Sequence, residues 1–294
     1  MKQSSKLPLA GCLTTDREKQ KSSPLVFVGL PDDSKSAYRK GTAKAPPLIR
    51  SAYDGDCHNS TTETGVDLFG RVADLGDLPS EDSWEKTAQS YREFAAELFE
   101  SSRTPFFAGG DHAVTVPIVD ALAVLNEPVH FVQIDAHPDL YPEFDGDRYS
   151  NACVAARILE MEHIVSVTQI GIRTLNPLQQ EIADQYRDRL EIHYARELMS
   201  ELPRLQDIAE DAAIYLSLDI DGLDPAYAPG VSYPEPGGLT TRQVLNFLQN
   251  GHWKLIGMDV VEVNPELDVN NLTAILAGKI FHEAMGYASK QIKY

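Results

Sequence analysis

The sequence predicts an α/β protein with three layers, α/β/α, in which a mainly parallel sheet of about eight strands lies between two layers of helices. Short apolar runs alternate with longer amphipathic stretches from Pro24 onward. Such alternation is typical of parallel sheets with helical crossovers. Several runs are apolar almost throughout, as expected of strands that are covered on both faces.

The expected strands are short and are bounded by turn-forming residues. They cover residues 25–30, 71–75, 105–108, 129–134, 164–171, 191–195, 213–219 and 255–263. The stretches between most of them have the length and apolar spacing of helices. These stretches are residues 83–100, 114–125, 152–161, 177–190, 241–250 and 272–285.

Length and charge limit the classes of function. Residues 24–294 are expected to form one domain, and residues 1–23 are polar and are interpreted as a flexible extension. The net charge of −18 disfavours nucleic acid and is compatible with a small cationic substrate. No apolar run is long enough to span a membrane. Three scattered cysteines fit a reducing compartment, so a cytoplasmic location is expected.

Acidic and histidine side chains follow three of the expected strands at the point where each strand ends. Alternate residues of an extended chain point to one side, and the carboxyl ends of parallel strands form the edge where ligands bind. Each residue alone could be a turn former or a helix N-cap, but together they indicate one site. The candidates are His112, Asp135, His137, Asp139, Asp219 and Asp221.

These side chains are suited to metal ions. Four carboxylates would balance the charge of two divalent cations. A mixture of carboxylate and imidazole suits Mn, Fe, Co, Ni or catalytic Zn better than Mg or Ca. Mn²⁺ is the first expectation and Ni²⁺ is possible.

Four segments resemble the signature segments of the ureohydrolase family, which includes arginase and agmatinase. They are GGDHAVT (109–115), DAHPD (135–139), SLDIDGLDPAYAPG (217–230) and MDVVEVNPELD (258–268). The resemblance extends over about residues 24–288 and, in segments 29–50, 234–240 and 271–280, leans towards agmatinase. It implies the same three-layer fold and a homo-oligomer, either a trimer or a hexamer.

The resemblance also implies a binuclear-metal amidinohydrolase, in which a metal-bridging hydroxide attacks a guanidino carbon and releases urea and an amine. Agmatine, converted to putrescine in polyamine biosynthesis, is the expected substrate. Asp139 would also accept a hydrogen bond from the hydroxide, and Glu262 would bind the guanidinium. The implied ligands are His112 and Asp139 for one metal, His137 and Asp221 for the other, and Asp135 and Asp219 as bridges.

The chain departs from the family where relatives commonly carry histidine in a Ser-His-Gly or Ser-His-Ala context, because it has Ser150-Asn151-Ala152-Cys153. Asn151 is expected to contact the substrate, yet asparagine cannot act as an acid or base near neutral pH. Alternatives therefore stay open. The substrate could be guanidinobutyrate, guanidinopropionate, guanidine or a substituted guanidine. The chain could be a catalytically silent, metal-binding subunit of a hetero-oligomer with a paralogue, or a hydrolase of another class, such as a deacetylase.

Overall fold

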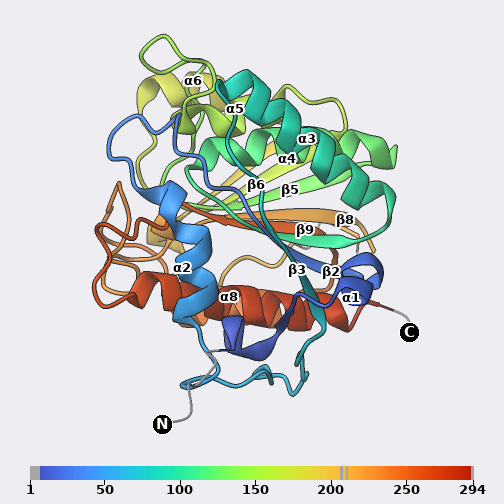
Figure 1. The fold of residues 1–294 in the computed structure, drawn as a ribbon. Coiled ribbons are helices and arrows are strands. Elements are labelled where there is room, and N and C mark those ends of the chain that lie inside the picture. Colours follow the sequence, from blue (N-terminus) through green and yellow to red (C-terminus); the bar gives the residue numbers. More distant parts are fainter. Residues whose placement is uncertain (1–6, 206–207, 210, 293–294) are drawn as a thin grey trace.

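The computed structural model describes residues 7–205, 208–209 and 211–292, and its centre is one sheet of nine strands between helical layers (Figure 1). Every pairing between neighbouring strands is parallel, in the order β1-β3-β2-β4-β9-β8-β5-β6-β7. The strands are β1 (Leu13–Thr14), β2 (Leu25–Gly29), β3 (Val72–Asp77), β4 (Thr104–Ala108), β5 (Val129–Ile134), β6 (Ile164–Ile172), β7 (Leu190–Tyr194), β8 (Ala213–Asp219) and β9 (Lys254–Val261).

The helices cover both faces of the sheet and form two separate apolar cores with it. One core joins the sheet to α2 (Ala45–Ala52), α7 (Thr241–Gln249) and α8 (Leu272–Ser289). The other joins it to α3 (Trp84–Glu100), α4 (Thr115–Ala121), α5 (Val154–Leu159) and α6 (Pro177–Gln185). A short helix, α1 (Arg17–Ser22), lies on the surface with no buried residue.

The predicted α/β/α fold is confirmed, and each expected strand is present. Strand β1 was missed because it lies in residues 1–23, which were expected to be a flexible extension. In the described part of that segment, Leu9, Cys12 and Leu13 are buried in the core and Leu13 pairs with Val72. A strand of two residues has no readable periodicity, which explains the error. Residues 1–6 lie outside the described residues.

Helix α8 is the most completely buried long helix of the described chain and is apolar on nearly all sides. It packs beneath the sheet, where Phe281 meets the edge of Phe27 with ring centroids 5.2 Å apart (Figure 1). A helix buried on all sides needs no polar face. In the described part of the chain, no helix has both the length and the apolarity that crossing a membrane requires.

The order of the strands determines where the site can form. Strands β4, β9, β8 and β5 are neighbours, and because they are parallel, their carboxyl ends lie side by side at one edge. After β4 the chain turns at Gly110, where an added Cβ would lie 1.8 Å from the backbone oxygen of Asp32, so only glycine fits. Asp111 then caps the next turn by accepting a hydrogen bond from the Ala113 N–H.

Candidate functional site

The six ligand-type side chains predicted from the sequence converge at this edge of the sheet. Five of them form two groups that share Asp135, and within each group the ligand atoms lie within 4.8 Å of one another. The sixth, Asp139, adjoins the first group through His112. His112 follows β4, Asp135 and His137 follow β5, and Asp219 ends β8. The two groups are His112, Asp135 and Asp219, and Asp135, His137 and Asp221.

In the first group, His112 Nδ1 faces three carboxylates. It lies 2.9 Å from Asp139 Oδ2, 3.2 Å from Asp135 Oδ2 and 3.4 Å from Asp219 Oδ2. Ligand atoms bound about 2.0–2.2 Å from one cation are roughly 3 Å apart at right angles. The spacing therefore matches a metal site.

In the second group, His137 Nδ1 lies 3.1 Å from Asp221 Oδ2 and 3.6 Å from Asp135 Oδ1. The two oxygens of Asp135 thus face different imidazoles, Oδ2 towards His112 and Oδ1 towards His137. A carboxylate in this position can bridge two cations. The distances therefore agree with the bridging role expected of Asp135.

Hydrogen bonds behind the cluster orient its members. Ser217 Oγ donates to Asp259 Oδ1 at 2.6 Å, so it can only accept from His112 Nε2, 3.0 Å away. This fixes the proton of the His112 imidazole on Nε2 and leaves Nδ1 as a lone-pair donor. Gln133 Nε2 donates to Asp135 Oδ2 at 2.7 Å and orients that carboxylate in turn.

Negative charge from the carboxylates predominates in the cluster. Burial opposes protonation of His137, but the carboxylates of Asp221 and Asp135 outweigh it and raise the pKa of His137 to about 12. Burial and then repulsion from Asp221 and Asp135 raise the pKa of Asp219 well above its usual range. Divalent cations would supply the missing charge.

One atom tests the fit to a metal directly. His112 is buried, and its Nδ1 has no hydrogen-bond partner among the described residues. A buried polar atom without a partner is costly and rare in folded proteins. A cation bound at this nitrogen removes the cost, so the residues present fit a metal centre.

Glu262 and Asn151, the two other predicted site residues, meet beside the cluster. Glu262 follows β9, and its Oε1 accepts from the His112 backbone N–H at 3.0 Å and from Asn151 Nδ2 at 2.9 Å. Burial raises the pKa of Glu262 to about 7, against the opposing effect of these donors. Its second oxygen, Oε2, has no hydrogen-bond partner in the described part of the chain.

Two of these residues have unusual backbone conformations. Asp139 and Glu262 have φ angles of 49° and 63°, in the left-handed region that residues with a side chain seldom adopt. Such strain tends to occur at functional sites, where the surrounding structure holds it in place. Here it turns both carboxylates into one cavity.

That cavity has a volume of about 230 Å³. All of the predicted site residues line it except Asp135, which is fully buried behind them. Its remaining wall consists of aromatic, alanine and neutral polar side chains, and no described lysine or arginine lines it. The side chains outside the predicted set are Ala37, Tyr141, Phe144, Ala152, Thr174, Gln179 and Tyr233.

Tyr233, from the long loop 222–238, lines the cavity. Arg173, which follows β6, fixes the loop. It donates to the backbone oxygens of Asp221 at 2.8 Å and Glu235 at 2.7 Å. One half-buried arginine therefore holds the loop against a strand end that carries a ligand.

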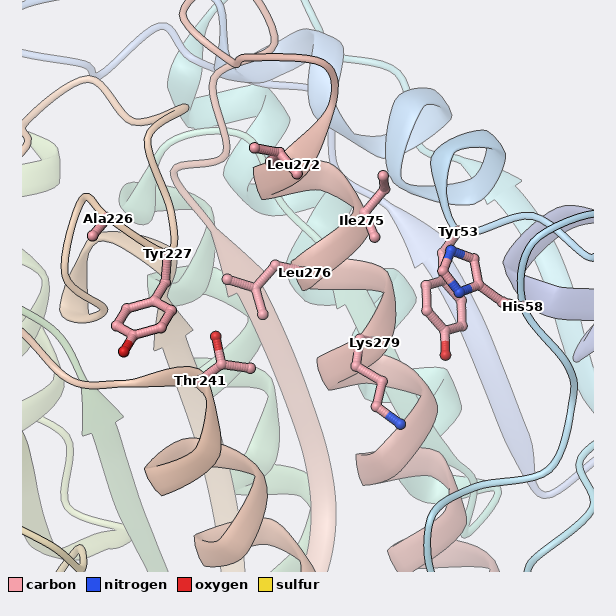
Figure 2. Close-up of a pocket in the computed structure, with 9 residues that line it drawn as sticks. All are labelled: Tyr53, His58, Ala226, Tyr227, Thr241, Leu272, Ile275, Leu276 and Lys279. Carbon is pink, nitrogen blue, oxygen red and sulfur yellow. The ribbon is translucent and has the colours of Figure 1, made fainter.

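A wider hollow of about 500 Å³ lies beside α8 and shares no lining residue with the carboxylate cavity (Figure 2). Leu272, Ile275, Leu276 and Lys279 project into it from α8 (Figure 2). Lys279 is engaged by Glu283, 2.5 Å away. The hollow contains none of the ligand-type clusters, so its larger size does not make it the chemical site.

Sequence reasoning missed the residues that support the ligands. Gln133, Ser217 and Asp259 lie inside β5, β8 and β9 and are fully buried. A polar residue inside an otherwise apolar strand was the available signal. Tyr233 left no comparable signal, because its position depends on the path of an irregular loop.

Comparison with known proteins gives a consistent result. The protein-family model described as "Arginase family" matches residues 23–286 of this chain. The mitochondrial arginase of Medicago truncatula is 37% identical over 279 residues, which cover 90% of this chain and 82% of that protein. The mitochondrial agmatinase of Gallus gallus is 33% identical over 279 residues, which cover 88% of this chain and 79% of that protein. The solved arginase from Medicago truncatula superimposes with a TM-score of 0.81 at 34% identity, over 96% of this chain and 95% of that one.

Proposed function

Because the chain belongs to the arginase family, we propose that it hydrolyses a guanidino compound at a centre of two divalent cations and releases urea and an amine. The observation that carries the proposal is the position of Asp135, whose two oxygens lie 3.2 Å and 3.6 Å from the Nδ1 atoms of His112 and His137. The buried carboxylates around it provide two adjoining metal positions.

The six ligand-type residues would hold the cations in the arrangement expected from the sequence. His112 and Asp139 would serve one ion, His137 and Asp221 the other, and Asp135 and Asp219 both. Bound divalent cations act as Lewis acids that lower the pKa of water. Mixed nitrogen and oxygen ligands suit several transition metals, of which we propose Mn²⁺ first and Ni²⁺ second.

The residues of the chain hold and orient the substrate cation. Glu262 Oε2, buried and without a partner in the described chain, accepts from a guanidinium N–H in a charge-assisted hydrogen bond. Asn151 fixes Glu262 through its Oε1. Asp139, which lines the same cavity, would accept a hydrogen bond from the attacking water.

The substrate we propose first is agmatine or another guanidino compound without an α-carboxylate. The lining has no described lysine or arginine, so a carboxylate would have to rely on neutral donors such as Gln179 and Thr174. The aromatic pair Tyr141 and Phe144, with ring centroids 5.2 Å apart, suits an aliphatic chain instead.

Arginine is the second candidate. The observation that favours it is the identity of 37% to a protein named arginase, against 33% to one named agmatinase. The leaning towards agmatinase therefore stays a prediction, to be decided by turnover.

The alternative of a silent subunit rests on Asn151, because an amide neither gains nor loses a proton near neutral pH. We also propose, from the family resemblance, a homo-oligomeric trimer or hexamer and, from the scattered cysteines, a cytoplasmic location. Analytical ultracentrifugation and cell fractionation test these two points separately.

The test of function is urea release by Mn-loaded and Ni-loaded protein. The panel is agmatine, guanidinobutyrate, guanidinopropionate, arginine, methylguanidine and guanidine, with Asp135→Ala as the inactive variant. Asp82→Ala is the matched control, because the Asp82 side chain is 89% exposed and forms a surface ion pair with Lys86. Turnover of one compound, lost in Asp135→Ala and kept in Asp82→Ala, supports the proposal. If protein with two metals bound releases no urea from any compound, the proposal is contradicted and the silent subunit is favoured.

A further inference from the structure

Three polar atoms in the carboxylate cavity are buried and have no hydrogen-bond partner among the described residues. They are His112 Nδ1, Glu262 Oε2 and the hydroxyl oxygen of Tyr233. The metal centre accounts for the first atom, and the proposed guanidinium accounts for the second. The Tyr233 hydroxyl is left over, although nearly all buried polar groups in folded proteins find a partner.

The Tyr233 side chain is held in place from several directions. Its ring packs against the edge of the His137 imidazole, with centroids 6.0 Å apart, and against Tyr38 at 5.8 Å. The preceding residue, Ser232, donates to the Arg39 backbone oxygen at 2.9 Å and accepts from Asn264 Nδ2 at 3.0 Å. The hydroxyl is therefore kept at the cavity by packing and by its backbone.

The phenol lies close to the carboxylate that the substrate needs. Burial and then the Glu262 carboxylate raise the pKa of Tyr233 above its usual range, so the hydroxyl stays neutral. The Asn151 side chain and the Tyr38 backbone oppose this shift, but no described group makes a well-formed hydrogen bond with the hydroxyl.

Asn151 does not fill this place, because other partners orient its amide and it makes no well-formed hydrogen bond with the Tyr233 hydroxyl. Its Nδ2 donates to Glu262 Oε1 at 2.9 Å, and its Oδ1 accepts from the Ala37 N–H at 3.1 Å. It is a positioning residue for Glu262. Glu262 Oε2 and the Tyr233 hydroxyl thus line one cavity, and neither makes a well-formed hydrogen bond within the described chain.

A guanidinium ion matches this pair, since all three of its nitrogens carry N–H donors and it has no acceptor. We infer that the Tyr233 hydroxyl accepts a hydrogen bond from the guanidinium, next to the one accepted by Glu262, and so determines selectivity for this cation. The inference rests on the proposed function and adds to it a contact that the signature segments do not contain.

The variant that isolates this contact is Tyr233→Phe, which keeps the ring against His137 and Tyr38 and removes only the oxygen. We expect KM for the guanidino substrate to rise roughly tenfold or more, as for loss of a hydrogen bond to a charged group. The metal content and Tm should stay as in the wild type. Tyr38→Phe is the control, because Tyr38 is 64% exposed and does not line the cavity.

The deciding experiment combines kinetics with binding. KM and kcat are measured on the best compound of the panel. Binding of guanidinium chloride, at millimolar concentration, to the metal-loaded protein is measured by isothermal titration calorimetry at low temperature. Weaker binding and a higher KM in Tyr233→Phe, with Tyr38→Phe unchanged, are the expected results. Equal binding by Tyr233→Phe and wild type, or an equal loss in Tyr38→Phe, would overturn the inference.

The two arms separate this inference from the function itself. If the wild type turns over a compound and Tyr233→Phe does so with unchanged KM, the inference fails while the function stands. If the wild type turns over nothing, the function fails, and the binding comparison still decides the role of Tyr233. Absence of guanidinium binding to both proteins also overturns the inference.

Discussion

Asn151 Nδ2 donates a hydrogen bond of 2.9 Å to Glu262 Oε1, and the same amide accepts one of 3.1 Å from the Ala37 backbone. The nitrogen and the oxygen of the amide are thus both engaged, and an amide neither gains nor loses a proton near neutral pH. In this chain, the position where relatives commonly carry histidine orients a carboxylate and does not supply an acid or base.

Replacing Asn151 with aspartate tests this relationship. Asn151→Asp removes the donor and places a second carboxylate beside Glu262, so we expect kcat/KM to fall about 10- to 100-fold. Steady-state kinetics and metal analysis by mass spectrometry check it, and metal content should not change. Asn59→Asp is the control, because Asn59 is exposed and uses only its oxygen, which aspartate retains. Unchanged kinetics in Asn151→Asp would contradict the account.

The hydrogen bond from His112 to Ser217 should tune the metal centre. Ser217→Ala removes the acceptor for His112 Nε2–H, and we expect metal affinity to fall about 10- to 100-fold, as for other outer partners of metal ligands. Titration against a chelating indicator measures this. Ser166→Ala is a matched control, since Ser166 makes the same type of bond, 2.7 Å to His130 Nδ1, away from the cluster. Equal affinity in Ser217→Ala and Ser166→Ala would contradict the prediction.

An ion-pair network on the surface predicts how stability depends on pH. The Arg242 hydrogen bond to Glu63, with smaller effects of Gln249 and Lys279, outweighs burial and lowers the pKa of Glu63 to about 2. Since the unfolded pKa of glutamate is about 4.3, the stabilisation is present above about pH 4.3 and is lost as the pH falls towards 2.

Glu63→Gln should therefore lower the free energy of unfolding at pH 7. The difference in this free energy between the two proteins should shrink as the pH falls below about 4. The Glu63 side chain is 36% exposed, so the effect at pH 7 is expected to be less than ~1 kcal/mol. Urea denaturation of both proteins at pH 7, 4 and 3 measures it. A difference that grows on acidification would show that the sign is wrong.

The cysteines should differ in reactivity. Burial raises the pKa of the Cys12 and Cys153 thiols to about 12, whereas Cys57 is exposed. Because only the thiolate reacts, iodoacetamide at pH 8 should label Cys57 alone in the folded protein and all three cysteines in denaturant. Peptide mass spectrometry reads the sites. Rapid labelling of Cys153 would contradict its burial.

Most of the sheet could be predicted because its strands are buried on both faces and read as apolar runs. β5 and β8 were found at their observed bounds, and the ligand residues were found because they interrupt those runs at the strand ends. The close contact of Gly110 with Asp32 likewise accords with the glycine pair in the sequence.

Other features depend on contacts that periodicity does not encode. β1 is short and pairs only through Leu13 and Thr14, so nothing in the sequence marks it as a strand. Asp259 is fully buried between Tyr215 and Ser217, and its role became clear only from their hydrogen bonds of 2.8 Å and 2.6 Å. Tyr233 reaches the cavity through a loop whose path the sequence does not reveal.

The most direct test of the central claim is the initial rate of urea release as metal-free protein is titrated with Mn²⁺, with bound metal measured at each point. The shared position of Asp135 predicts that the rate reaches its maximum only when about two ions are bound per chain. It also predicts that Asp135→Ala stays inactive at every Mn²⁺ concentration. A maximal rate at one bound ion, or full occupancy of both positions without urea release from any guanidino compound, would contradict the account.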